Sequence, residues 1–203
     1  TELNKVGIAT TDTRFPADGV DLSPAFQKAM DGKPDLIFME GAGNQAALLL
    51  SGRIKAGAEN VPTLAGGTVA TQPLLTLAKG TNQLDNVSIV MLPAQHYIPP
   101  ADRSEVLKEF LSVVKKQGPL VSPLNTYAAG WDIVALWADA VATIDGEVTS
   151  EKINEAMKHI PASAPRLMFQ KVFTPTNNYV QPTEGDFVIG IPTAVTDGMF
   201  EYK

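Results

Sequence analysis

The stretch "DLIFMEGAGNQAALLLSGRIKAG", residues 35–57, decides how the rest of the chain is interpreted. An apolar run stops at a glycine-rich turn, and a helical pattern of apolar side chains begins directly after it. Such an unbroken run is typical of a parallel strand that is covered on both faces. The stretch therefore predicts a strand, a tight turn and a helix, which is the repeating unit of an α/β domain.

The same alternation continues on both sides of this stretch. Short apolar runs predict further strands at residues 5–9, 61–65 and 87–91. Ser23 and Pro24 predict a helix start, because serine can cap a helix and proline fits its first position. Residues 73–78 predict another short helix. Strands that alternate with helices indicate a mainly parallel sheet.

The pattern changes after residue 92. The stretch "PAQHYIPPADR", residues 93–103, reads as a proline-rich loop, and three helices follow it. Asp102 and Glu105 resemble a capping box for the first of these helices, residues 126–144 form the second, and Ser150 begins the third. The tail returns to strands at residues 168–173, 187–191 and 199–202.

Composition excludes several classes of function. The net charge of −6 disfavours a nucleic-acid partner, because a phosphate backbone would be repelled on average. The absence of cysteine removes thiol catalysis, disulfides and zinc-thiolate sites. No apolar stretch approaches the roughly 20 residues that span a bilayer. No signal sequence is present in this chain, and its first residues are expected to be a trimmed boundary.

Catalytic groups are scarce. The two histidines, His96 in the proline-rich loop and His159 near a helix end, have no acid at metal-ligand spacing. No G-x-S-x-G marks a nucleophile elbow. Trp131 and Trp137 are six residues apart and so lie on different faces of one helix. The sequence therefore predicts no catalytic residue, no metal site and no cofactor.

The glycine turn after residue 39 allows three interpretations. Gly41, Gly43 and Ala46 match the dinucleotide fingerprint G-x-G-x-x-A, but no acid ends the next strand to bind a ribose. The glycines could instead only tighten the turn, or a small ligand could bind at the helix N-terminus. Gly67 and Thr68 follow the next strand, so two turns of small residues could line one crevice.

Several stretches, taken in order, carry a family resemblance: "FPADGVDLSPAFQKAMDGKPDLIFMEG", "AALLLSGRIKAGAENVPTLAGG", "SIVMLPAQHY" and "NTYAAGWDIVALWADAVATIDGEVTSEKINEAMKHI". Together they resemble the type I periplasmic solute-binding proteins, specifically the leucine/branched-chain amino-acid receptor family of ABC transporters. The resemblance implies an α/β fold of two lobes that are joined by three crossovers and close on a solute.

The resemblance also implies a division of the chain. Residues 1–92 would be an α/β segment of the second lobe, residues 93–165 a helical crossover segment of the first lobe, and residues 166–203 strands that return to the second. Most of the N-terminal lobe would be missing, so the helices would lack the sheet that they normally cover. We therefore expect a partner, either a complementary N-terminal polypeptide or an intertwined homodimer.

For the binding site the resemblance implies an aromatic residue near Ala42 and Gly43 and an acid at Gly67. Both places hold small, uncharged residues here. This absence favours a bulkier or non-zwitterionic solute, such as an aromatic or other carboxylate or an amide, over an amino acid bound in the usual way. The candidate ligand-binding residues are Gly43, Asn44, Gln45, Gly67, Thr68, Tyr97 and Tyr127.

The predicted function is that of a non-enzymatic receptor, periplasmic or extracellular, that delivers a small organic solute to the membrane subunits of an ABC importer. A ligand-sensing domain of a regulator or signalling receptor with the same fold is the first alternative. A nucleotide-dependent enzyme built on the glycine turn and a pure interaction module are the others.

Overall fold

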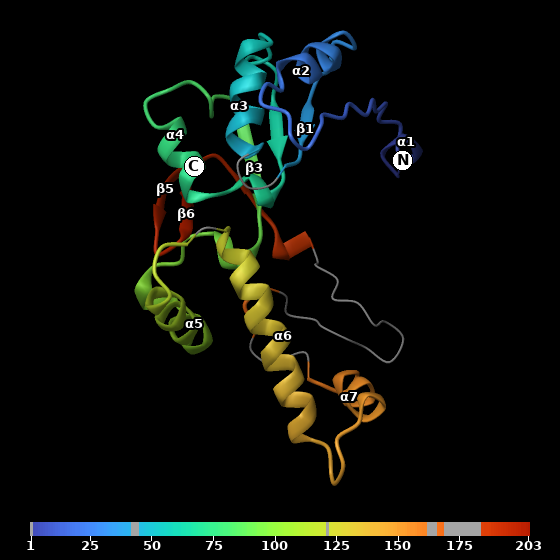
Figure 1. The fold of residues 1–203 in the computed structure, drawn as a ribbon, viewed down its shortest axis with the longest axis vertical. Coiled ribbons are helices and arrows are strands. Elements are labelled where there is room, and N and C mark those ends of the chain that lie inside the picture. The colour runs from blue at the N-terminus through green and yellow to red at the C-terminus, as the bar shows by residue number, and fades with distance from the viewer. Residues whose placement is uncertain (1, 42–44, 121, 162–165, 169–183) are drawn as a thin grey trace. The chain divides into compact units, whose positions relative to one another are not determined.

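The computed structural model describes residues 2–41, 45–120, 122–161, 166–168 and 184–203 (Figure 1). The chain divides into two compact units, Thr1–Ile89 and Val90–Lys203. None of the described helices is both long and apolar enough to cross a bilayer.

The first unit is built on parallel strands, as predicted. Strand β1 (Ile37–Met39) pairs with β2 (Thr63–Ala65), and β2 pairs with β3 (Val87–Met91). Strands alternate with helices, which are α2 (Ser23–Met30), α3 (Gln45–Lys55) and α4 (Gln72–Ala78), and a 3-10 turn η1 (Gly67–Val69) follows β2. This alternation confirms the predicted α/β class.

The hydrophobic core of the first unit lies between its helices and strands. Leu22, Phe26, Leu49, Leu50 and Ile89 are buried there. Helices α2 and α3 pack closely because α3 carries a glycine at position 52: a Cβ there would lie 2.9 Å from the backbone carbon of Leu22.

Strand β1 departs from one expectation. Ile37 and Met39 are buried, but Phe38 between them is 61% exposed. Successive side chains of a strand point to opposite faces, so only one face of β1 is covered in the structure. The prediction that both faces are covered is therefore wrong for this strand.

The predicted strand at residues 5–9 is also wrong. Residues 2–5 form a short helix, α1 (Glu2–Lys5), and no strand follows it among residues 6–9. The backbone N–H groups of Val6 and Ile8 both donate to the carbonyl of Leu3, and the side chain of Val6 is 72% exposed. Apolar residues form a strand only where a neighbouring strand pairs with them and a core covers them.

The second unit begins with the 3-10 turns η2 (Pro93–Gln95) and η3 (Pro100–Asp102). Three helices follow, α5 (Glu105–Lys116), α6 (Leu124–Ala142) and α7 (Ser150–Met157). The cap of α5 is Ser104, whose hydroxyl accepts from the N–H of Leu107, and not the predicted Asp102, which ends η3. Thr149 caps α7 in the same way, by accepting from the N–H of Lys152.

The end of the chain contains the turn η4 (Glu184–Asp186), β4 (Val188–Gly190), β5 (Pro192–Thr196) and β6 (Met199–Tyr202). Strands β5 and β6 form an antiparallel hairpin, of which the sequence predicted only β6. Its turn residues Asp197 and Gly198 have positive φ angles of 55° and 81°. Both residues tolerate this conformation, and paired positive φ angles suit the twist of a tight hairpin. The predicted strand at 168–173 lies almost entirely outside the described residues.

An apolar cluster forms the core of the second unit. Phe110, Leu124, Ala128 and Met199 are fully buried in it, and Trp131 packs edge-on against Phe110 with 5.7 Å between ring centroids. Trp137, on the same helix, is 50% exposed. The prediction that the two tryptophans occupy different faces of α6 is confirmed.

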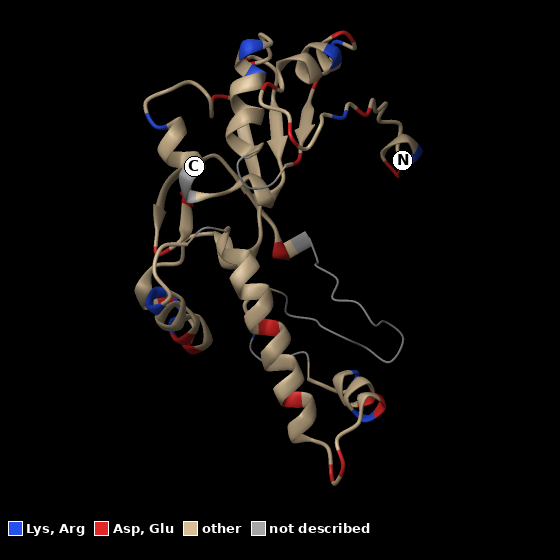
Figure 2. Ribbon diagram, viewed as in Figure 1, with Lys and Arg blue, Asp and Glu red and all other residues tan. Residues whose placement is uncertain are grey.

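Two acidic residues on α6, visible as separate red bands in Figure 2, hold the segment that follows α7. The Asp132 carboxylate accepts hydrogen bonds from the backbone N–H groups of Leu167 and Met168, at 3.0 and 2.8 Å. Asp139, two turns further along, forms an ion pair with Arg166 at 2.7 Å. The polar positions of α6 thus serve packing within the second unit.

Candidate functional site

The candidate site lies where β1 and β2 end. Glu40 and Gly41 follow β1, and Gly66, Gly67 and Thr68 follow β2. The two strands are parallel, so both turns lie at the same edge of the sheet. In open α/β sheets this carboxyl edge is where ligands bind.

Glycines allow the two turns to approach their neighbours closely. A Cβ on Gly41 would lie 2.6 Å from Cδ1 of Leu49 in α3, so this glycine fits the turn against its helix. A Cβ on Gly66 would collide with the carboxylate of Glu40. The glycine pattern therefore has a packing role, and at Gly66 it also makes room for a charged group.

The hydroxyl of Thr68 joins the two turns. It lies 2.8 Å from the carbonyl oxygen of Gly41 and is also hydrogen-bonded to the Glu40 carboxylate. Both Thr68 and Glu40 are exposed. Their polar atoms therefore reach solvent while their positions are set by each other.

Of the candidates predicted around the first turn, only Gln45 can be placed. It is the first residue of α3, and its amide Nε2 donates to the carbonyl of Ala17 at 2.7 Å. This side chain fastens the loop before α2, which is a structural use of the predicted ligand amide. Gly43 and Asn44 lie outside the described residues.

Glu40 was missed by sequence reasoning. It is the first residue after the apolar run and so stands at the carboxyl end of the predicted strand. The rule that directs attention to this edge of the sheet applies to Glu40 as much as to the glycines beside it. An acid directly after a buried strand was therefore the signal available.

The two predicted tyrosines belong to the second unit. Both are half-buried and pack against its apolar cluster. The backbone N–H of Tyr97 donates to the carbonyl of Phe200 at 2.9 Å, and the Arg103 guanidinium lies 5.8 Å from the centre of the Tyr97 ring. The structure thus brings Gly67 and Thr68 together with Glu40 in one unit and places Tyr97 and Tyr127 in the other.

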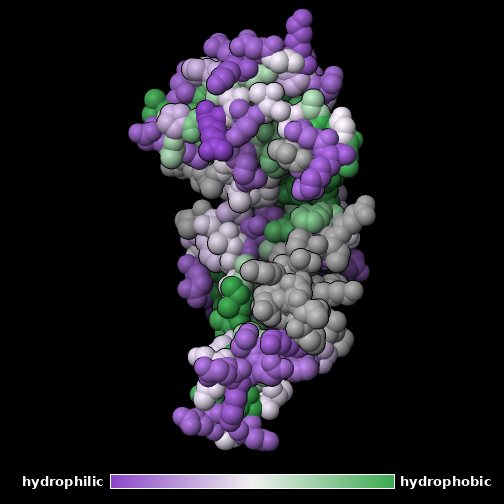
Figure 3. Space-filling model, turned by 90° about the vertical axis from the view of Figure 1, so that its right-hand side faces the viewer, coloured by the Kyte–Doolittle hydropathy of each residue, from purple (hydrophilic) through white to green (hydrophobic). Residues whose placement is uncertain are grey.

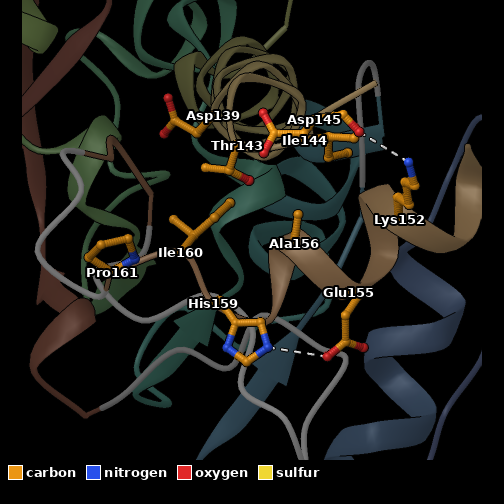
Figure 4. A pocket seen from close by; sticks show the side chains of 10 residues that line it. All are labelled: Asp139, Thr143, Ile144, Asp145, Lys152, Glu155, Ala156, His159, Ile160 and Pro161. Atoms are coloured by element: carbon orange, nitrogen blue, oxygen red, sulfur yellow. Dashed lines mark hydrogen bonds and ion pairs between the residues drawn. The ribbon is translucent and has the colours of Figure 1, made fainter. Parts of the chain in front are cut away.

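A separate hollow of about 490 Å³ lies between α7 and the end of α6 (Figure 4). Ile144, Ala156 and Ile160 contribute apolar surface to it. Several of its charged groups have partners: Glu155 contacts His159 at 3.2 Å and Lys158 at 2.9 Å, and Lys152 donates to the carbonyls of Asp145 and Glu147. Asp139, which also lines the hollow, forms an ion pair with Arg166 at 2.7 Å.

The two histidines have different surroundings. Within the described ranges no group of three or more His, Asp or Glu side chains could hold a metal ion. Burial lowers the pKa of His96, whose ring lies edge-on to Tyr202 at 6.4 Å. The ring of His159, two residues after α7, lies 3.2 Å from the Glu155 carboxylate and also lines the hollow.

Several solved structures share this fold. An extracellular ligand-binding receptor from Rhodopseudomonas palustris HaA2 is 19% identical over 98% of this chain, with a TM-score of 0.74. A leucine-binding protein from Thermotoga maritima MSB8 is 21% identical over 100% of this chain, with a TM-score of 0.63. A solute-binding protein of an ABC transporter from R. palustris BisB5, in complex with 3,4-dihydroxybenzoic acid, is 21% identical over 91%, with a TM-score of 0.62.

The chain spans about half the length of these proteins: 56%, 53% and 48% of them, respectively. No curated protein matches the chain. The family model described as "Periplasmic binding protein" matches residues 2–183, which is most of the sequence. Together with the parallel sheet and the shared fold, this match confirms the resemblance noted from the motifs. The chain belongs to the periplasmic binding protein family and shares its type I fold with a leucine-binding protein.

Proposed function

We propose that this chain is the solute-binding part of an extracytoplasmic receptor that delivers its solute to the membrane subunits of an ABC importer. The observation that carries the proposal is the polar edge of the parallel sheet, where Glu40, Gly67 and Thr68 meet at the ends of β1 and β2. Exposed polar atoms at this edge, in a family of binding proteins, support recognition of a small molecule.

The solute is proposed to be a small organic molecule. Similar structures include a leucine-binding protein and a protein that holds 3,4-dihydroxybenzoic acid, so the fold accommodates both aliphatic and aromatic acids. A non-enzymatic role is proposed because the family is one of binding proteins. A solute that touches two lobes would favour their closed arrangement, which an importer could then recognise.

A second polypeptide is proposed to cover α6. Ile133, Val134 and Trp137 on this helix are 65%, 66% and 50% exposed. Hydrophobic side chains also reach the surface among hydrophilic ones on the face drawn in Figure 3. Water-exposed apolar groups on one helix mark an interaction surface. The covering polypeptide would be a complementary N-terminal chain or a second copy of this chain.

Thermal unfolding with a panel of compounds tests the proposed function. We expect at least one of leucine, benzoate and 3,4-dihydroxybenzoate to raise the melting temperature in a saturable manner, because a ligand that binds only the folded state stabilises it. Thr68→Val should weaken this effect, whereas Thr126→Val, an exposed threonine on α6, should not. A rise with NAD or ATP and with none of the three acids would favour the nucleotide-dependent alternative and contradict the proposal.

A further inference from the structure

Glu40 supplies a negative charge at an edge of the sheet where sequence reasoning found none. Its carboxylate is hydrogen-bonded to Thr68, and a Cβ on Gly66 would collide with it. Gly66 itself is buried, and its N–H donates to the carbonyl of Met39 at 3.1 Å. The carboxylate therefore lies against the turn that follows β2.

The carboxylate retains capacity for further hydrogen bonds. An ionised carboxylate has about four lone-pair sites, and Thr68 donates only one hydrogen. Glu40 is exposed, so the remaining sites face solvent. A solute that enters this edge would meet a fixed hydrogen-bond acceptor.

The charge of Glu40 is not neutralised within the described part of the chain. No lysine, arginine or histidine described in the structure forms an ion pair with it, whereas Asp21, Asp197 and Glu155 each have a cationic partner. An acid with a fixed position and no cation attracts a positive group and repels another carboxylate.

We propose that Glu40 is a ligand-contacting residue that selects solutes by a protonated nitrogen or an N–H or O–H donor, and turns any solute carboxylate away from this edge. The inference rests on the proposed function, because it assigns a role within the same solute site. It also changes what the lack of an acid at Gly67 implies. The turn after β2 has no acid there, but Glu40 in the turn after β1 would supply one.

The test is calorimetric titration of the purified protein with matched solutes. Leucine is compared with 4-methylpentanoate, which lacks the ammonium group. Benzylamine, which carries an ammonium group, is compared with benzoate, which does not. Benzoate is also compared with 3,4-dihydroxybenzoate, which adds hydroxyl donors. The variants are Glu40→Gln, which keeps shape and a partner for Thr68 but removes the charge, and Glu109→Gln as an exposed control on α5.

We expect wild type to prefer the donor-bearing member of each pair. Glu40→Gln should weaken the binding of that member roughly 10- to 100-fold, which is the range for a hydrogen bond to a charged group. The affinity for the donor-free acid should stay unchanged or increase. Glu109→Gln should bind like wild type. Equal binding by wild type and Glu40→Gln, or a wild-type preference for the donor-free acids, would overturn the role of Glu40 alone. No binding of any solute by wild type would instead overturn the proposed function, and this inference with it.

Discussion

Arg53 shows how one residue can hold the first unit together. It is fully buried on α3, and its guanidinium donates to Oγ1 of Thr63 at 2.9 Å and to the carbonyls of Glu59 and Asp85 at 2.7 and 2.9 Å. These bonds tie the helix to β2 and to the loops before β2 and β3. A planar group with five donors suits this arrangement better than an ammonium.

Arg53→Met should therefore destabilise the protein by about 2–4 kcal/mol, because it leaves buried carbonyl groups without donors. Urea unfolding followed by circular dichroism measures the change. Arg14→Met, at a side chain that is 89% exposed, should shift the free energy of unfolding by less than about 0.5 kcal/mol. Equal effects of the two substitutions would contradict this account of Arg53.

His96 is expected to make stability depend on pH. Burial lowers its pKa in the folded state, so below pH about 6.5 the unfolded chain binds more protons than the folded one. The free energy of unfolding should then fall as pH decreases from about 6.5 toward the folded pKa. Carboxyl groups with lowered pKa values, such as Asp197 beside Lys115 and Arg103, act in the same direction but only at more acidic pH.

His96→Asn should reduce the loss of stability between pH about 7 and 5, as measured by urea midpoints at a series of pH values. The loss below pH about 4.5 should remain, because the carboxyl groups are unchanged. An unaltered slope between pH about 7 and 5 in the variant would show that another group titrates there.

At the scale of single residues, sequence alone went only part of the way. The place of Gly67 and Thr68 in a turn after β2 was predicted because glycine and small polar residues there are visible in the sequence, and their role in binding stays a prediction. Glu40 was overlooked although its place directly after an apolar run is visible in the sequence, and the capping role of Ser104 depends on where α5 begins. Gln45 was predicted as a ligand group, but a long-range partner, Ala17, takes its amide.

Helix α6 combines two kinds of surface. Its acidic positions bind the segment after α7, while Ile133, Val134 and Trp137 remain exposed. Burial raises the pKa of the Asp132 carboxyl, and hydrogen bonds from the N–H groups of Leu167 and Met168 oppose this rise. The carboxylate therefore acts as a buried acceptor for two backbone groups.

Asp132→Asn should destabilise the protein by about 1–3 kcal/mol, because one of its two acceptor oxygens is replaced by an amide that faces backbone donors. Denaturant unfolding of the variant beside Asp102→Asn, an exposed acid in η3, gives the comparison. We expect the control to unfold like wild type. An Asp132 variant as stable as wild type would mean that water replaces the carboxylate without cost.

Elements were predictable where the pattern was local. Strand β3 has the predicted bounds, and α3 and α6 differ from prediction by one or two residues at each end. The prediction of a strand at residues 5–9 was wrong, because a strand needs a pairing partner that the local sequence does not reveal. Strand β5 was missed because its proline and threonines form no apolar run, and its partner β6 and the Asp197–Gly198 turn define it.

At the scale of the whole molecule, the exposed face of α6 predicts association. Native mass spectrometry should show a species heavier than the 21.6 kDa chain, and Trp137→Lys should reduce its share because a charge would be buried on binding. Val20→Lys, at a residue that is 84% exposed in the first unit, serves as the control. A monomer at all concentrations, in wild type and variants alike, would contradict a polypeptide cover for α6.

We propose above that a small solute binds at the ends of β1 and β2. Backbone amide chemical shifts, recorded while the protein is titrated with the tightest-binding acid or amine of the panel, test it most directly. We expect saturable shifts that are largest at Glu40, Gly41 and Gly66–Thr68, with little change around α7. Shifts concentrated instead at the hollow between α6 and α7 would contradict it.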